Sequence, residues 1–481
     1  MDKLAYLRSL FMMTALGFCS PLCAQPSNPN QTDTITPISP TQDNIPFHLR
    51  IQTADFSLPN GNHSGVFATH DGKWVFLAGR TNGLHGFNDD TNNFPPEQQN
   101  QAVYVVDPHK KKVYSRLLTD PGSGLTAQQI DQLSVTSPQS YQDGDIVYIT
   151  GGYGVDSSTG LFSTKDVLTA IDVPALIHWV THPCSKKLLS HNVRQLSDPN
   201  FQVTGGFMSK VDHGHPTLLV FGQNFLGYYV PESEGIYTMQ VRRFKIHDDG
   251  KILKVTLLPP LPATPDPNYR RRDLNVCPTI KVKHGKIVKG LTAFSGVFTL
   301  DSGVWTVPVE ITAAGIPTMA DPNAPRTFKQ GMNNYVSAGV EFFSQRYRDF
   351  YVTLFGGISY GYFQNGVFMT DTQFPFINDV TTIKRDKHGI YSQSLMTAEF
   401  PVILSTQSNP GNPLLFGTGA YFITASDIPK YGNEVIKLDK IHGKHTVIGY
   451  IVGGIMSTLP NTTSESDSAA SPYIFEVILD R

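Results

Sequence analysis

Residues 143–152 read DGDIVYITGG: an Asp-Gly turn, a run of five strand-forming residues, and two glycines. Asp-Gly between apolar runs is a strong hairpin signal, because a type I′ turn needs positive φ at both central residues and glycine adopts it without steric cost. The run that follows has the length of a single strand. Each copy of this phrase therefore predicts one β-hairpin.

Related phrases recur along the chain, each with an Asp-Gly or His-Gly turn except the copy at Arg348, which has no turn glycine. They begin near residues 70, 143, 213, 284, 348 and 442, so most intervals are roughly 65 to 75 residues and hold four strands each. The last unit ends one strand short, whereas the segment 47–56, from Phe47 to Phe56, precedes the first unit without a partner. We therefore predict an all-β fold, a single six-bladed β-propeller of four-stranded blades over residues 46–481, closed by that segment. A β-sandwich array is the alternative, but it does not require such closure.

The first 45 residues differ from the rest. Lys3 and Arg8 precede an apolar stretch and small residues that end at Ala24, the pattern of a secretory signal peptide. Residues 25–45 are rich in Ser, Thr, Asn, Gln and Pro, which is typical of a flexible leader. No later stretch is long and apolar enough for a membrane span, so we expect an exported protein, periplasmic or extracellular.

The amino-acid composition also favours an all-β protein. Charged residues make up 16% of the chain and aromatic residues 11%, with 41 glycines and 34 prolines, a balance that favours strands and turns. The formal net charge of −2 gives no support to a nucleic-acid partner.

Three of the repeats end in a glycine doublet: Gly151-Gly152, Gly356-Gly357 and Gly453-Gly454. These doublets resemble those of kelch-type, galactose-oxidase-like propellers. The other three units have a single glycine there, and the tryptophan and tyrosine usual in later strands of that family are largely absent. The resemblance implies a fold and no particular activity.

The predicted topology separates short turns from long loops. Naming the strands of a blade a to d from the channel outward, a–b and c–d turns lie on one face, the turn face. The b–c loops and the blade connections lie on the other, the long-loop face. The long segments are expected on the long-loop face, where binding residues tend to collect. The same register places Cys184 and Cys277 in non-adjacent blades, so we expect two unpaired, mostly buried thiols.

Arg270, Arg271 and Arg272 form the densest charge cluster, where a connection enters the inner strand of blade four. We expect them to face the central channel, where guanidinium groups bind a carboxylate or phosphate bidentately. The alternative is a solvated loop with Asp273 as a partner at the start of the strand.

Other candidates on the same face combine donors, acceptors and aromatic rings, which suit sugars or peptides. For any one of them, ordinary loop composition is the simpler explanation. These residues are Arg80, His85, Gln223, Asn224, Tyr228, Arg326, Asn334, Tyr335 and Tyr360.

Signals for particular chemistries are weak. His213 and His215 have metal-pair spacing, but they occupy a turn with no third ligand nearby. No serine elbow, His-Glu-x-x-His or phosphate-binding glycine loop occurs. The sequence therefore predicts no metal, no cofactor and no assignable catalytic residue.

Two functions remain open. The first is an exported, non-enzymatic binding propeller that captures a glycan, peptide or protein on its long-loop face. The alternative is a periplasmic sugar-acid mutarotase or lyase, as some kelch-type propellers resemble, in which the arginine cluster holds a carboxylate. The oligomeric state is open.

Overall fold

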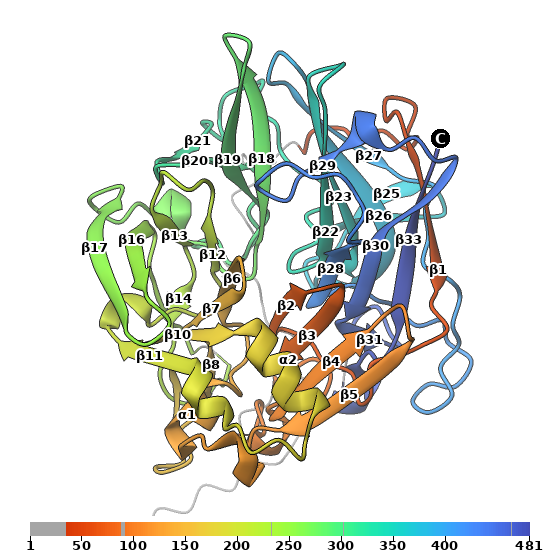
Figure 1. Ribbon diagram of the computed structural model, residues 1–481. Helices are drawn as coiled ribbons and strands as arrows, with labels where there is room; N and C mark the ends of the chain where they lie inside the picture. The colour runs from red at the N-terminus through yellow and green to blue at the C-terminus, as the bar shows by residue number, and fades with distance from the viewer. Residues whose placement is uncertain (1–34, 88–91, 232, 302, 463) are drawn as a thin grey trace, which may run out of the picture. The chain divides into compact units, whose positions relative to one another are not determined.

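The computed structural model describes residues 35–87, 92–231, 233–301, 303–462 and 464–481. The predicted signal peptide lies outside these residues. The unit from Ile35 to Arg481 is a six-bladed propeller (Figure 1) in which each blade has four antiparallel strands, and the sheet of blade five gains a short fifth strand. This confirms the predicted fold.

The inner three strands of every blade, and the outer strand of the first five, follow each other in the sequence. From the inner strand outward they are, in blades one to six, β2 (Val66–His70), β3 (Lys73–Leu77), β4 (Ala102–Asp107), β5 (Lys112–Leu117); β6 (Gln139–Asp143), β7 (Ile146–Thr150), β10 (Val167–Asp172), β11 (Val193–Ser197); β12 (Phe207–Lys210), β13 (Thr217–Val220), β16 (Val241–Asp248), β17 (Leu253–Leu261); β18 (Asn275–Lys283), β19 (Lys286–Phe294), β20 (Val309–Thr312), β21 (Pro317–Met319); β22 (Ala338–Ser344), β23 (Asp349–Ile358), β26 (Phe376–Arg385), β27 (Tyr391–Leu395); β28 (Ala420–Thr424), β30 (His445–Gly453), β33 (Ile474–Asp480).

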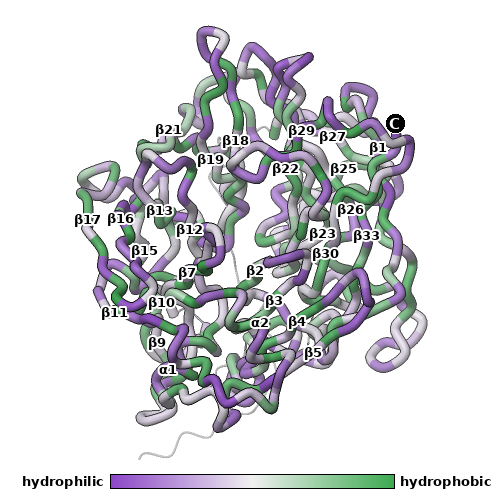
Figure 2. The backbone as a smooth tube through the Cα atoms, viewed as in Figure 1, coloured by the Kyte–Doolittle hydropathy of each residue, from purple (hydrophilic) through white to green (hydrophobic). Residues whose placement is uncertain are grey.

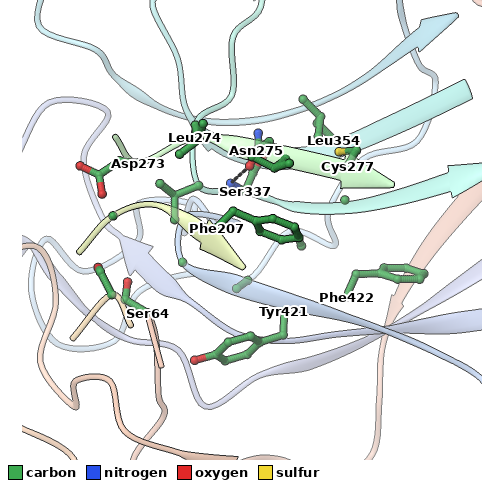
Figure 3. A pocket seen from close by; sticks show the side chains of 18 of the residues that line it. Ser64, Phe207, Asp273, Leu274, Asn275, Cys277, Ser337, Leu354, Tyr421 and Phe422 are labelled. Atoms are coloured by element: carbon green, nitrogen blue, oxygen red, sulfur yellow. Dashed lines mark hydrogen bonds between the residues drawn. The ribbon is translucent and has the colours of Figure 1, made fainter. Parts of the chain in front are cut away.

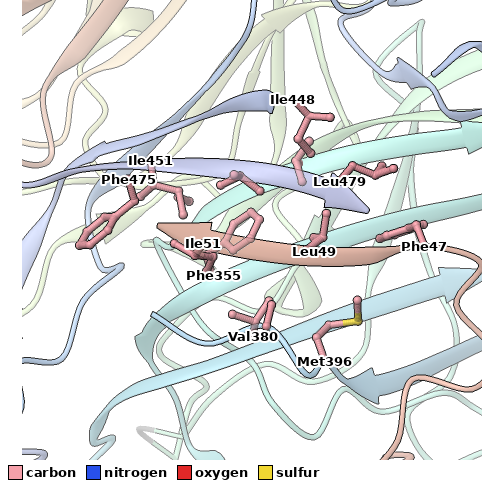
Figure 4. Packing of buried hydrophobic residues seen from close by; sticks show 14 of the residues in the cluster. Phe47, Leu49, Ile51, Phe355, Val380, Met396, Ile448, Ile451, Phe475 and Leu479 are labelled. Carbon is pink, nitrogen blue, oxygen red and sulfur yellow. The ribbon is translucent and has the colours of Figure 1, made fainter. Parts of the chain in front are cut away.

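The sixth blade is completed by β1 (His48–Thr53), as predicted from the unpaired N-terminal segment. It pairs antiparallel with β33, from His48 opposite Asp480 to Thr53 opposite Phe475. Leu49 and Ile51 alternate with exposed residues and are buried. Figure 4 shows them packed among side chains from blades five and six. Closure thus buries an apolar strand face and pairs the outer edge of β33.

The residue pair after strand b has the same backbone conformation in all six blades. Both members have positive φ, whether the pair is Gly-Gly or has another residue first; the pairs are 78–79, 151–152, 221–222, 295–296, 356–357 and 453–454. The second member is always glycine. At Gly79 a Cβ atom would lie 2.3 Å from the His63 carbonyl oxygen, so the chain approaches too closely for any side chain.

Short hairpins extend the long-loop face: β8 (Tyr153–Val155) with β9 (Phe162–Thr164), β14 (Gln223–Asn224) with β15 (Ile236–Tyr237), β24 (Gly361–Gln364) with β25 (Val367–Thr370), and β31 (Ile455–Ser457) with β32 (Ser468–Ala470). The sequence pattern predicts strand c of blade three over residues 237–246, but β16 begins at Val241. Tyr237 instead pairs with Gln223 in the β14–β15 hairpin.

Two α-helices occur among the described residues, α1 (Ala127–Gln132) and α2 (Val173–Thr181). They coincide with the two stretches whose sequence predicts helix, residues 125–133 and 174–180. Thr126 forms a capping box at α1, and Asp172 caps α2 through the Ala175 amide. Long segments were expected only on the long-loop face, but two of them lie on the turn face. Segment 173–192, which contains α2, and segment 425–444, which contains β29 (Ile436–Lys437), join strands at the turn face; β29 pairs parallel with β22.

The core lies between the sheets. Phe47 packs on Phe342 and Tyr351, with ring centroids 4.7 and 5.6 Å apart, and Figure 2 shows hydrophobic residues along the strands and hydrophilic ones at many turns. No helix among the described residues has the length and apolar character to span a bilayer. Cys277 is buried, as expected, but Cys184 is exposed in the segment after α2; neither forms a disulfide.

The segment that follows Ile35, in the expected leader, lies against the outer strand of blade five. The Ser39 amide donates to the Gln393 carbonyl at 2.9 Å, and the Leu395 amide donates to the Ser39 carbonyl at 2.9 Å. These bonds occupy part of the free edge of β27.

Candidate functional site at the channel mouth

Six equivalent residues surround the mouth of the central channel, one at the entrance to each inner strand. All have positive φ, between 49° and 68°, and we call them the mouth ring: Ser64, Ser137, Gly205, Asp273, Val336 and Gly419. All six line the same cavity. Small side chains at four of the six positions leave the mouth open.

Backbone hydrogen bonds link neighbouring members of the mouth ring. In five steps the amide of one residue donates to the carbonyl of a neighbour: Ser64 to Gly419, Ser137 to Ser64, Gly205 to Ser137, Asp273 to Gly205, and Gly419 to Val336, at 2.6–3.2 Å. Between blades four and five the Asn275 side chain makes the link, because its Oδ1 accepts from the Ser337 amide at 3.1 Å. The mouth is therefore a rigid frame.

The cavity behind the mouth ring has a volume of about 340 Å³. Figure 3 shows Asp273 and Ser64 toward one end and Leu354, Cys277 and Phe422 toward the other. Polar groups therefore lie near the mouth, and the deeper part is lined by apolar side chains together with the carboxyl group of Glu341. A cavity of this size accommodates a small ligand.

Asp273 is the one ionisable side chain of the mouth ring. Burial raises the pKa of its carboxyl group, and the neighbouring Arg272 opposes that rise. Its φ of 49° is a conformation that Asp tolerates better than most residues. A carboxyl group held at a channel mouth offers a strong hydrogen-bond acceptor to a ligand.

Arg272 binds a set of protein partners beside Asp273. Its Nη1 lies 3.2 Å from Asp273 Oδ2, its Nε donates to the Tyr237 hydroxyl at 3.1 Å and its Nη2 to the Tyr229 hydroxyl at 3.3 Å. The guanidinium also lies 5.1 Å from the Phe298 ring centroid. The arrangement fixes both the carboxylate and two tyrosine rings in place.

An aromatic cluster from blades one to three adjoins Arg272. His85 stacks on Phe94, with centroids 4.9 Å apart, and meets Tyr229 edge-on at 4.8 Å. Burial lowers the pKa of His85 to about 4, and the positive charges of Arg272 and Arg80 act in the same direction. The imidazole is therefore neutral at ordinary pH.

The other predicted arginines are held by the protein. Arg271 has no exposed surface, and its guanidinium donates to the Ser295 and Val307 carbonyls. Burial lowers its pKa to about 9. The expectation that Arg271 faces the channel is therefore wrong, because its side chain enters the interior of blade four.

Arg270 remains on the long-loop face, where it donates to the Phe298 and Thr299 carbonyls and pairs with Glu234. Arg80 is 2% exposed; it donates to Asn82 and to the Pro95 carbonyl. Both arginines thus hold loops together.

The remaining candidates divide by burial. Gln223 and Asn334 are buried, and Asn334 donates to the Gly356 carbonyl. Asn224 donates to Gln202 at 3.1 Å. These amides support the loops that surround the mouth, a structural role.

Tyr335 directly precedes Val336 of the mouth ring. Burial raises the pKa of its hydroxyl, and the charge of Asp273 adds to the rise. Tyr228 is 40% exposed and contacts Phe162, and Tyr360 contacts Phe374. Arg326 is exposed in the connection to blade five, with no ion pair or ring contact among the described residues.

Sequence reasoning did not select Tyr237, His63 or Glu341 for the site. Tyr237 was assigned to a regular strand, and the turn-rich composition of 223–236 was the available signal for an extra hairpin. His63 is 4% exposed, and burial lowers its pKa to about 3. Glu341 lines the deeper cavity, where burial raises its pKa to about 7.

The arrangement defines a six-bladed β-propeller with a framed, partly polar channel mouth. No family model matches the sequence, and no curated protein matches it. One similar solved structure, "Structure of YjhT", is 11% identical with a TM-score of 0.41, over 88% of this chain and 99% of that chain. Similarity at this level transfers no property to the present chain.

Proposed function

We propose that this chain is an exported binding propeller, without catalysis, that captures a neutral, hydroxyl-rich ligand such as a glycan at the channel mouth. The observation that carries the proposal is Asp273: it is the ionisable member of the mouth ring and it faces a cavity of about 340 Å³. Export rests on the signal-peptide pattern of residues 1–24.

The charges around the mouth favour a neutral ligand over an anionic one. Arg272 is shared among Asp273, Tyr229 and Tyr237, and Arg270 is paired with Glu234. A ligand carboxylate would have to break these bonds and would also approach the Asp273 carboxylate. Sugar hydroxyls, in contrast, donate to a carboxylate without competing for the arginines.

The rest of the cavity suits a glycan as well. Phe207, Tyr421 and Phe422 line it together with Ser64 and Ser337, and Figure 3 shows rings and hydroxyls around one space. The apolar faces of sugar rings pack on aromatic side chains, while hydroxyl groups of the protein form hydrogen bonds with the hydroxyl groups at the edges of the sugar. A peptide or protein ligand would need to place a similarly small polar group in the mouth.

The test is calorimetric binding of a panel of neutral and acidic oligosaccharides to wild type and to Asp273→Asn. We expect a neutral glycan to bind, and the variant to bind it about tenfold or more weakly, because a hydrogen bond to a charged group is lost. Asp321→Asn, an exposed acid of the same face, serves as the matched control and should bind as wild type. Equal binding by the Asp273 variant, or binding confined to acidic sugars, would overturn the proposal.

A second candidate is a sugar-acid mutarotase or lyase. It is favoured by one observation, the raised pKa of Asp273 at 3.2 Å from Arg272, since a carboxyl group of raised pKa beside a cation can exchange protons with a bound sugar acid. NMR exchange spectroscopy on a uronic acid tests it. Anomer exchange that wild type accelerates and Asp273→Asn does not would favour this enzyme over the binding propeller.

A further inference from the structure

The turn face carries its own pattern at four hairpin tips in blades three, four and five. Each tip combines cationic residues with an exposed apolar side chain. Figure 1 shows one of them, the β18–β19 hairpin, extending beyond its neighbours. We call this set the tip cluster: Lys251 and Ile252; Lys283, Lys286, Ile287 and Val288; Arg346, Tyr347 and Arg348; Lys387 and Ile390.

The apolar members of the tip cluster are exposed to solvent. Ile390 is 65% exposed, Ile252 54%, Tyr347 47%, and Ile287 and Val288 40% each. Side chains of this kind gain free energy by leaving water, about 25 cal/mol per Å² of apolar surface. They recur at four tips of three consecutive blades, whereas single exposed residues of this kind are common.

The cationic members have no carboxylate within ion-pair distance among the described residues. The nearby acids accept from backbone amides or pair with other cations. Asp249 accepts from the Lys251 and Ile252 amides, Asp386 from the His388 and Ile390 amides and Asp439 from the Arg346 amide, while Glu310 pairs with Lys281 and Arg385. The guanidinium and ammonium groups of the six cations therefore make no ion pair among the described residues.

We propose that the tip cluster docks this propeller on a membrane surface that carries anionic headgroups. Basic side chains would contact the headgroups while the apolar tips enter the boundary with the acyl chains, the combination that interfacial binding requires. A soluble polyanion would use the cations but would give the exposed isoleucines no apolar partner. Because these tips and the long-loop face lie on opposite faces, docking would leave the channel mouth facing away from the membrane.

The test is co-sedimentation with phosphatidylcholine vesicles, alone or with about 30% phosphatidylglycerol, at low and high salt. We expect binding to the mixed vesicles, weakened by salt. Arg346→Glu/Arg348→Glu should lower the partition coefficient at least about tenfold, since each basic residue near the surface contributes about 1 kcal/mol. Lys186→Glu/Lys187→Glu, an equal change of charge on the same face in blade two, is the matched control and should bind nearly as wild type.

A second pair of variants tests insertion separately from charge. Ile287→Ser/Ile390→Ser should lower binding several-fold without changing its salt dependence, whereas Val402→Ser on the long-loop face should not. Equal loss in both double-charge variants, or no loss in the serine variant, would overturn docking through the tip cluster. Binding to heparin as tight as to mixed vesicles would also overturn it, in favour of a soluble polyanion.

Discussion

The arginines near the channel mouth differ from those at the β22–β23 hairpin tip of the turn face in their exposure and partners. On the long-loop face Arg80, Arg270 and Arg271 are buried and donate to carbonyls, amides or an acid of the same chain. At the tips of the turn face Arg346 and Arg348 are exposed without an ion pair. The comparison teaches that the densest run of arginines is scaffold, and that the cations free to meet a partner are scattered among separate turns.

The largest effect that would sharpen this comparison is at Arg271. Arg271→Ala should lower the free energy of unfolding by about 2–4 kcal/mol, because it leaves a cavity and the Ser295 and Val307 carbonyls without their donor. Denaturant titration measures it. Arg271→Met, which fills most of the volume, should lose less; no loss in either variant would mean that the guanidinium is not structural.

A smaller effect is expected from the buried histidine of the long-loop face. The folded pKa of His63 is lowered to about 3, below the value of about 6.5 for an unfolded chain. The unfolded state therefore binds more protons as pH falls below 6.5, so stability falls with it. Between pH 6.5 and 5 wild type should lose about 1–2 kcal/mol more than His63→Gln, measured by denaturant titration at each pH. His85, with a pKa of about 4, acts in the same direction; parallel curves for the two proteins would contradict the assignment.

The smallest effect is at the exposed turn of blade five. Arg348→Gly should raise the free energy of unfolding by about 0.5–1 kcal/mol, since glycine adopts a φ of 60° without strain. Arg348→Ala, which keeps the strain, should leave stability within about 0.5 kcal/mol of wild type. Thermal unfolding of the three proteins distinguishes these cases, and destabilisation by glycine would show that the arginine makes a contact that the structure does not contain.

The sequence was sufficient to predict the architecture, because hairpin turns and apolar runs are local signals. Closure by residues 47–56 followed from counting strands. The three units without a glycine doublet resemble the other three less clearly in sequence, because Ala78, Phe221 and Ser295 stand in place of the first glycine. Their backbone is nevertheless left-handed like that of Gly151. At Gly151 itself a Cβ atom would lie 1.8 Å from the Val203 carbonyl oxygen, so that blade requires glycine at the first position as well.

The candidate site was less predictable than the fold. Three consecutive arginines cannot all face the channel, because side chains of an extended segment alternate between its two sides. Arg270 and Arg272 accordingly lie on the long-loop face and Arg271 enters the blade. The alternation of side chains along an extended segment is therefore enough to predict that Arg271 points to the opposite side from Arg270 and Arg272. The hydrogen-bond partners of Arg272 could not be predicted from neighbouring residues in the sequence, because Tyr229 and Tyr237 belong to a hairpin in the preceding blade.

The pairing of β1 with β33 also has a kinetic meaning. Among the described strands, β1 leaves the ribosome first and β33 last, so β1 must wait for nearly the whole chain before its partner exists. Contacts of such long sequence separation form late and slowly. In the meantime an apolar strand with Leu49 and Ile51 stays exposed, which makes the unfinished ring a substrate for chaperones and a source of aggregation until the last strand arrives.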